Sequence, residues 1–269
     1  MACCLVFALA ARSAGAEPPK PKDGPLGMKF VPLPKATTYL GWDGKEGSAK
    51  KTEIKEDFEI AIHTVTQGQW QELMGKNPSY FSRAGGGKNL VKAIKDEDLK
   101  QFPVDSVSWN KAQEYIKMLN EKEKESGYLY RLPTCAEWEY ACRGGATSEE
   151  ECSFHFYFYK PTNDLSSKQA NINGNYPFGN AEKGPYLERT TKVGSYAPNK
   201  LGLYDMHGNV WQWCVEDYDP KGSPQRNKGG GWNYTALHSV AAMRYRVVSD
   251  NDGHLGLRLV RVPVRAQDK

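Results

Sequence analysis

The sequence predicts a loop-rich fold of mixed α and β structure. The chain has 269 residues, with 26 Gly, 16 Pro and 12% aromatic residues. This composition favours turns and ordered loops held by buried rings. Long apolar runs are few, and short stretches with helix-like and with strand-like apolar spacing both occur. The length is enough for one large domain or two small ones.

The charge balance is mild. A formal net charge of +4 arises from 36 basic and 32 acidic residues, without basic blocks. Composition therefore gives no support for nucleic-acid binding, and we expect no nucleic-acid partner.

Residues 1–16 predict an export signal. An apolar core at residues 5–11 precedes Ala14-Gly15-Ala16, a small-residue cleavage site. No Lys or Arg precedes this core, so an apolar N-terminus without a targeting role is the alternative. The run is too short to span a bilayer, and Cys3 and Cys4 lie ahead of it, which disfavours a lipoprotein anchor. We expect a periplasmic or secreted protein without membrane attachment after signal removal.

Four cysteines remain after such a signal: Cys135, Cys142, Cys152 and Cys214. Cys135 and Cys142 fall on one predicted helix with Cα atoms about 10 Å apart, beyond disulfide reach. A Cys142–Cys152 bridge, a Cys142–Cys214 bridge and buried free thiols all stay open.

The first elements follow from local patterns. Residues 17–27, rich in Pro and Lys, predict a flexible linker. Residues 28–33 predict a strand, and the alternation over residues 57–65 predicts another. Thr66 is expected to cap a short helix that ends at Gly75.

Two longer helices follow. Ser108 caps the longest, which runs out in residues 121–126. Its buried face is predicted to hold Trp109, Ala112, Tyr115, Ile116 and Leu119. Thr134 and Glu137 form a capping box that opens the next helix, which ends at residues 143–145.

The second half of the chain predicts long ordered loops over residues 146–198. Closing strands are expected at residues 201–207, 228–232 and 255–264. The aromatic run at residues 154–159 predicts core, with an exposed surface that stacks on sugars or apolar side chains as the alternative.

Several motifs occur in one fixed order along the chain. They are Val65-Thr66-Gln67-Gly68-Gln69-Trp70, Phe102-Pro103-Val104, Arg131-Leu132-Pro133-Thr134-Cys135-Ala136-Glu137-Trp138, Gly202-Leu203-Tyr204-Asp205-Met206-His207-Gly208-Asn209-Val210-Trp211-Gln212-Trp213, Gly229-Gly230-Gly231-Trp232 and Gly256-Leu257-Arg258. The chain resembles the formylglycine-generating enzyme (sulfatase-modifying factor) family in these motifs. The resemblance implies one α+β domain over residues 28–264 with a C-type-lectin-like core, little regular structure and long ordered loops, followed by a tail at residues 265–269.

The chain departs from this family at the oxidase site. Family oxidases convert a sulfatase cysteine to formylglycine with copper and molecular oxygen, using two cysteines five residues apart. Those positions correspond to Tyr234 and Ser239, or, counted from the Arg-Tyr-Arg motif, to Leu237 and Ala242. No cysteine follows Cys214.

Loss of the thiols disfavours copper. Cu(I) prefers thiolate or thioether ligands, whereas a phenol and a hydroxyl are protonated and hard. His238 and Met243 are the alternative ligands that could hold copper in place of the thiols. The histidines show no ligand-like spacing for an iron site, and Glu216, Asp217 and Asp219 predict a solvated acidic loop more than an acid–base pair.

Calcium is the expected cofactor. The resemblance implies one structural calcium site at Asp205, the carbonyls of Gly208 and Val210, and Gln212, where the family has Glu. Asn171 and the Ile172 carbonyl match half of a second site, with Glu182 as a guess for its completion. Hydrogen bonding of these groups without an ion is the alternative reading of the same residues.

We expect an exported monomer that binds a peptide, glycan or protein and lacks the cysteine-dependent oxidase. The alternative is an oxidoreductase that modifies a sulfatase cysteine or another substrate through a non-cysteine site. The ligand groove is predicted to be lined by Trp211, Trp232, Asn233, Tyr234, His238, Ser239 and Arg244.

Overall fold

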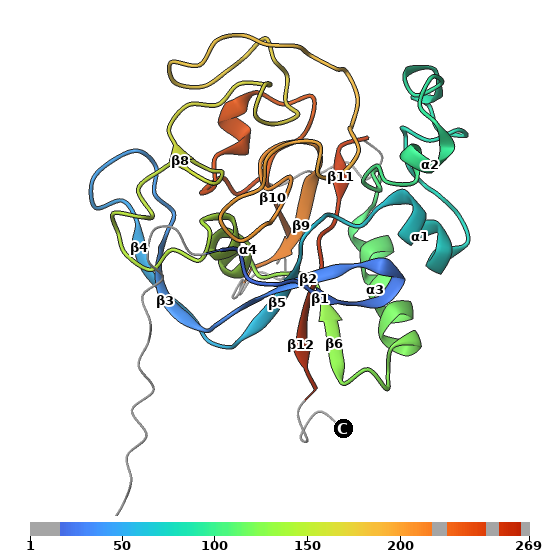
Figure 1. The fold of residues 1–269 in the computed structure, drawn as a ribbon, viewed down its shortest axis with the longest axis horizontal. Helices are drawn as coiled ribbons and strands as arrows, with labels where there is room; N and C mark the ends of the chain where they lie inside the picture. The colour runs from blue at the N-terminus through green and yellow to red at the C-terminus, as the bar shows by residue number, and fades with distance from the viewer. Residues whose placement is uncertain (1–16, 217–224, 246–252, 265–269) are drawn as a thin grey trace, which may run out of the picture.

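The computed structural model describes residues 17–216, 225–245 and 253–264 (Figure 1). The predicted export signal at residues 1–16, the tail at residues 265–269, and Asp217 and Asp219 lie outside the described residues.

A five-stranded antiparallel sheet joins the two ends of the domain. Its strand order is β1 (Lys22–Asp23), β2 (Lys29–Leu33), β5 (Phe58–Ala61), β12 (Val260–Pro263) and β6 (Tyr128–Arg131). The last strand in sequence therefore lies between two much earlier ones, where Val260 is opposite both Ile60 and Arg131. Val31, Ile60 and Val260 are neighbours across three adjacent strands and are fully buried, so this row of side chains faces the core.

The described residues contain four α-helices: α1 (Gln67–Met74), α2 (Asp96–Leu99), α3 (Trp109–Lys122) and α4 (Cys135–Cys142). Thr66 and Thr134 each form the capping box with the residue three positions later, and Ser108 caps α3. Helices α1 and α3 pack through Trp70 and Tyr115, whose rings stack with centroids 4.8 Å apart. The predictions for these three longer helices are confirmed.

The remaining elements are short. A three-stranded sheet has the order β10 (Gln225–Lys228), β9 (Trp211–Val215) and β11 (Leu255–Gly256), with β9 parallel to β11. Two ribbons pair β3 (Ala36–Leu40) with β4 (Lys50–Ile54) and β7 (Phe156–Tyr157) with β8 (Pro161–Thr162). The 3-10 helices are η1 (Pro25–Gly27), η2 (Lys88–Leu90) and η3 (Ala236–Ser239). Residues 163–210, all of them described, contain no regular helix or strand, so the predicted α+β fold with long ordered loops is confirmed.

Three strand predictions and the linker need correction. Residues 201–207 form turns, because Gly202 and Asp205 adopt positive φ. Residues 228–232 leave the sheet after Lys228, since Gly229 and Gly230 also have positive φ. The predicted strand over residues 255–264 is two short strands, β11 and β12. The expected linker at residues 17–27 contains β1 and η1, because β1 pairs with β2 and the Asp23 carbonyl accepts a bond from Arg261.

The four described cysteines are buried free thiols, so the structure contains neither predicted bridge. Cys142 Sγ lies 3.7 Å from His207 Nε2, and Cys152 Sγ lies 3.8 Å from Thr38 Oγ1. Cys214 neighbours Cys135 instead. Burial raises the pKa of Cys142 to about 12, which keeps this thiol protonated and unreactive.

The aromatic run at residues 154–159 belongs mainly to the interior. Phe156 and Tyr157 are buried, while Tyr159 is 57% exposed. The Tyr157 hydroxyl accepts a 2.6 Å bond from Arg143, which ties this run to the end of α4.

A buried ion cluster connects α4 to β10. The Glu139 carboxylate bonds Arg143 at 2.7 Å and Lys228 at 3.0 Å, and all three side chains are fully buried. Burial by itself raises the pKa of Glu139, but the charges of Lys228 and Arg143 outweigh burial and lower the pKa to about 2. Lys228 also donates to the Ala241 carbonyl at 2.8 Å, so the cluster fixes the segment after η3.

We predict that Glu139→Gln destabilises the protein by about 3–5 kcal/mol, because it leaves two buried cations without a carboxylate. Urea unfolding monitored by tryptophan fluorescence measures the change. The matched control is Glu121→Gln, which removes an exposed pair with Lys117 at the same helical spacing and is expected to cost less than about 1 kcal/mol. Equal effects of the two substitutions would contradict the prediction.

Candidate functional site

The glycine-rich turn after β10 builds the predicted site. Gly229 and Gly230 have φ values of 97° and 79°, in the left-handed region that favours glycine. A Cβ on Gly230 would lie only 2.2 Å from Ser239 Oγ. The turn therefore brings the backbone after β10 directly against η3, and glycine is required for that approach.

Tyr234 lies inside an aromatic cluster. Its ring centroid is 5.3 Å from Trp211, 5.2 Å from His238 and 5.3 Å from His254. Its hydroxyl is 3.5 Å from His254 Nε2. The place that corresponds to the first oxidase cysteine is thus filled by a ring with aromatic neighbours.

Ser239, at the second cysteine position, is fully buried. Its carbonyl is 2.7 Å from His207 Nδ1, while His207 Nε2 accepts a 2.8 Å bond from the Tyr157 amide. Burial lowers the pKa of His207 to about 4, so the ring is neutral and Nδ1 donates to Ser239. In the other register, Leu237 is 50% exposed and Ala242 half-buried. Neither register brings a thiol to these positions.

The structure corrects the predicted groove. Trp211 is fully buried beneath Tyr234 and Tyr245, whose ring stacks on it at 5.1 Å. It is therefore a core residue and no groove wall, and the buried Ser239 is likewise no part of a surface. Arg244 is exposed and pairs with Glu216 at 3.2 Å, and His238 Nδ1 bonds Thr235 Oγ1 at 2.9 Å. Asn233 is half-buried beside Trp232.

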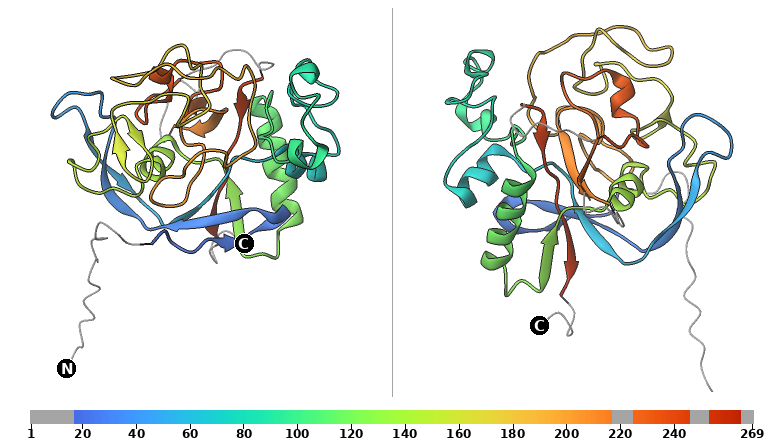
Figure 2. Two further views of the ribbon diagram at one scale, coloured as in Figure 1. Left: turned by 45° about the horizontal axis from the view of Figure 1, so that its top comes forward. Right: turned by 180° about the vertical axis from the view of Figure 1, so that it is seen from behind.

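Trp232 instead packs against aromatic side chains from other loops. Its half-buried ring meets Phe81 edge-on at 5.2 Å and stacks on Tyr186 at 6.1 Å. The long loops of residues 163–210 surround η3 at this end of the molecule, away from the outer ends of β6 and β12 (Figures 1 and 2). We define the aromatic ledge as Tyr80, Tyr176, Tyr186, Trp232 and Leu237. Tyr80, Tyr176 and Leu237 are 41%, 58% and 50% exposed.

Two backbone bonds join the parts of the ledge. Ala236 N–H donates to the Tyr176 carbonyl and Asn173 N–H to the Tyr234 carbonyl. Sequence reasoning named Trp232 but missed Tyr80, Tyr176 and Tyr186. These tyrosines lie far from Trp232 in the sequence. Only Trp232 belongs to a sequence motif, the glycine-rich turn, that indicated a functional position.

The first expected calcium set does not fit an ion in this arrangement. Gln212 is fully buried, and its Oε1 accepts 2.8 Å bonds from Trp138 Nε1 and Arg258 Nε. Its Nε2 donates to the Asp205 carbonyl at 2.8 Å. Both lone-pair positions of the amide oxygen are used, and a buried guanidinium stands next to it. A calcium ion here would face a fixed positive charge.

The second set is also engaged by protein groups. Asn171 Nδ2 donates to the Arg189 carbonyl and to Asn209 Oδ1, and the Asn171 carbonyl accepts from Asn209 N–H. Glu182 is exposed and pairs with Lys168 at 3.4 Å. Hydrogen bonds between protein groups therefore connect these loops.

No group of three or more His, Cys, Asp or Glu side chains in residues 17–216, 225–245 and 253–264 is arranged to hold a metal ion. His238 contacts Tyr234, and Met243 packs among apolar side chains.

Comparisons with known proteins agree with this framework. A family model described as a sulfatase-modifying factor enzyme 1-like domain matches residues 17–263. The chain is 30% identical over 258 residues to the chaperone protein LppX of Paenibacillus barcinonensis, covering 81% of this chain and 84% of that protein. It is 31% identical to the formylglycine-generating enzyme of Mus musculus, covering 86% of this chain and 61% of that one.

A third relative is named an inactive enzyme. The inactive Cα-formylglycine-generating enzyme 2 of Mus musculus is 34% identical over 173 residues, covering 62% of this chain and 47% of its own. The chain thus spans about half to three-fifths of the length of these enzyme relatives.

Solved structures share the fold. The Treponema denticola variable protein 1 superposes with a TM-score of 0.66 at 23% identity, over 90% of this chain and 98% of its own. PvdO from Pseudomonas aeruginosa gives a TM-score of 0.62 at 22% identity, over 92% and 99%. The α+β fold with a C-type-lectin-like core is thereby established, and the chain belongs to the family of the sulfatase-modifying factor enzyme 1-like domain.

Proposed function

We propose that this chain is an exported polypeptide-binding member of its family that lacks the cysteine-dependent oxidase. The observation that carries the proposal is the aromatic ledge. An exposed apolar surface on a folded domain is typical of an interaction site, and its rings offer contact area at low cost in side-chain entropy.

The site chemistry supports the absence of the oxidase. Tyr234 and Ser239 stand at the cysteine positions, the first packed among rings and the second buried. One relative is named an inactive enzyme and another a chaperone protein. The name chaperone protein is in line with the polypeptide-binding role proposed for this chain.

Export rests on residues 1–16 alone. Within the described residues, no helix combines the length and the apolar character needed to cross a membrane. The protein is proposed to act as a monomer on its polypeptide ligand, with no nucleic-acid partner.

A second candidate is an oxidoreductase with a non-cysteine site. The observation in its favour is that His238 and His254 both contact Tyr234, and imidazole is a ligand for copper and iron.

The oxidase test uses the full chain with Cu(I), air and a peptide containing Cys-x-Pro-x-Arg, with mass spectrometry of the product. We expect no aldehyde, since no thiol pair holds the copper. The mouse formylglycine-generating enzyme serves as the positive control, and Tyr234→Cys/Ser239→Cys tests whether the framework still supports the reaction. Copper-dependent aldehyde formation by the unmodified chain, abolished by His254→Phe, would instead establish the second candidate.

The ledge test measures binding of a fluorescent unfolded polypeptide by anisotropy. We expect Tyr176→Ala/Tyr186→Ala to weaken binding by about tenfold or more, because stacked aromatic contacts are lost. The matched control is Tyr159→Ala, which removes a comparably exposed ring outside the ledge. Equal loss in both variants would contradict a specific ledge, and binding of oligosaccharides in place of the polypeptide would reassign the ligand class.

A metal test follows from the bonds of Gln212. We expect a calcium chelator to leave the thermal unfolding midpoint of the unmodified chain unchanged. In Gln212→Glu the donor to the Asp205 carbonyl is replaced by a carboxylate oxygen, so calcium is expected to raise the midpoint of this variant by about 2 °C or more. A chelator-induced fall in the midpoint of the unmodified chain would show that an ion is bound despite the present bonds.

A further inference from the structure

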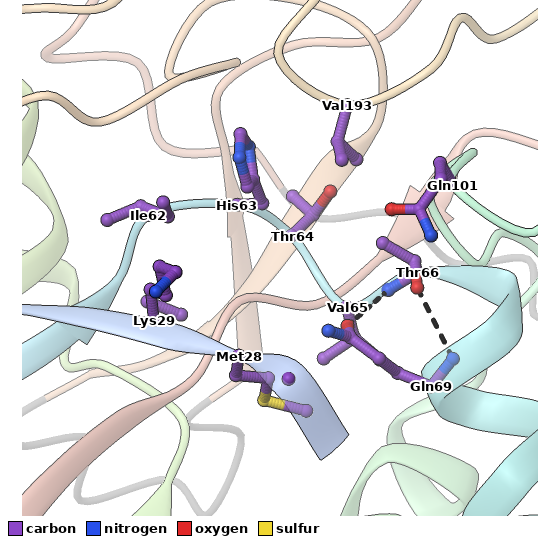
Figure 3. Close-up of a pocket in the computed structure, with 12 residues that line it drawn as sticks. Met28, Lys29, Ile62, His63, Thr64, Val65, Thr66, Gln69, Gln101 and Val193 are labelled. Carbon is purple, nitrogen blue, oxygen red and sulfur yellow. Dashed lines mark hydrogen bonds between the residues drawn. The ribbon is translucent and has the colours of Figure 1, made fainter. Parts of the chain in front are cut away.

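A cavity of about 310 Å³ lies between β2, the β5–α1 connection and two loops (Figure 3). Its size is at the lower end of the range for small-molecule sites. None of its lining residues belongs to the aromatic ledge. The cavity is therefore a separate place on the molecule, and an inference about it does not depend on the proposed function.

Two residues that line the cavity carry a buried polar atom without a hydrogen-bond partner. These atoms are Thr64 Oγ1 and His63 Nδ1, and Thr64 is only 1% exposed. The Thr64 side chain is directed toward Val193 and Gln101 (Figure 3). Buried polar atoms without partners are rare and unfavourable in folded proteins. A ligand that supplies the missing partners would remove this penalty.

Two neighbouring polar side chains, those of Thr66 and Gln69, are already used by the fold. Thr66 Oγ1 accepts from the Gln69 amide, and Gln69 Oε1 accepts from the Thr66 amide. Gln69 Nε2 donates to the Leu26 carbonyl. The capping box of α1 and the bond to Leu26 therefore account for Thr66 and Gln69, whereas Thr64 Oγ1 and His63 Nδ1 have no such partner.

The His63 ring is held firmly in place. Its centroid is 4.9 Å from that of Tyr204, and a Cβ on Gly194 would lie 2.9 Å from His63 Cε1. Burial, with a smaller contribution from Arg258, lowers the pKa of His63 to about 4. The ring is neutral near pH 7, so one ring nitrogen carries a proton that Nδ1 is able to donate.

The charges around the cavity favour an anion. Lys29 lines it, and none of the described lining residues is acidic. Lys29 pairs with Asp23 at 2.7 Å, but the Asp23 side chain is 87% exposed, and such surface pairs contribute little. The buried guanidinium of Arg258 adds a second positive charge that acts on His63.

We infer that this cavity binds a small carboxylate with an apolar body. The carboxylate oxygens accept hydrogen bonds from the Thr64 hydroxyl and from His63 Nδ1–H, with Lys29 near the mouth. The apolar body packs against Met28, Ile62 and Val193, which line the same cavity. Such a ligand is either a free aliphatic acid or the C-terminal residue of a polypeptide, since both present the same chemistry.

The test is isothermal titration calorimetry of the full chain with 4-methylpentanoate, N-acetyl-leucine and N-acetyl-leucinamide. We expect at least one of the two acids to bind and the uncharged amide to bind about tenfold more weakly or not at all. Tighter binding of 4-methylpentanoate identifies a free acid as the source, and tighter binding of N-acetyl-leucine identifies a polypeptide C-terminus.

The variants separate the site from the fold. Thr64→Val removes the hydroxyl at nearly constant volume, so affinity for the acid should fall about tenfold or more. Because that hydroxyl has no partner in the protein, the thermal midpoint should not fall. Thr64→Ser, the matched control, retains the hydroxyl and the binding. Equal affinity for acid and amide, unchanged affinity in Thr64→Val, or no binding of either acid would each overturn the inference.

Discussion

The arrangement of this domain depends on the hydrogen bonds of the Gln212 side chain. From the second position of β9, this side chain bonds three separate parts of the chain: Trp138 on α4, the turn at Asp205, and Arg258 before β12. Arg258 in turn donates to the carbonyls of Ala61 and Tyr204. Each bond contributes only about 1 kcal/mol net. Breaking the set would leave the indole N–H of Trp138 and the Nε–H of Arg258 buried without an acceptor, which costs considerably more.

The same strand separates the two main apolar clusters. Cys214 belongs to the cluster with α4, whereas Trp211 and Trp213 belong to the cluster with α3. Side chains alternate along a strand. Because Gln212 points toward α4, Trp211 points to the opposite face, toward the cluster with α3. Trp211 there supports Tyr234, and the glycine turn at Gly229 and Gly230 brings Trp232 to the surface. The aromatic ledge is thus a consequence of the way β9 is fixed.

The parts predicted from the sequence were those with a local cause. Thr66, Ser108 and Thr134 identified helix starts because a cap acts within three residues. The turns at residues 201–207 were mistaken for a strand, since their apolar pattern does not reveal the positive φ of Asp205. The groove prediction failed at Trp211 for a different reason. Its burial depends on Tyr234 and Tyr245, which lie more than twenty residues away in the chain.

The substitutions relative to the oxidase pattern are physically consistent with one another. A tyrosine ring at position 234 fills its space through contacts with Trp211 and His254, so loss of the thiol leaves no hole. A neutral glutamine at position 212 satisfies Trp138 and Arg258 by hydrogen bonds, where a metal ion would need free oxygen atoms. Packing and hydrogen bonds between protein groups therefore hold the side chains at these two positions. The ledge, and not the positions of Tyr234 and Ser239, carries the proposed function because Tyr176 and Leu237 are exposed there, whereas Ser239 is buried and Tyr234 is packed among rings.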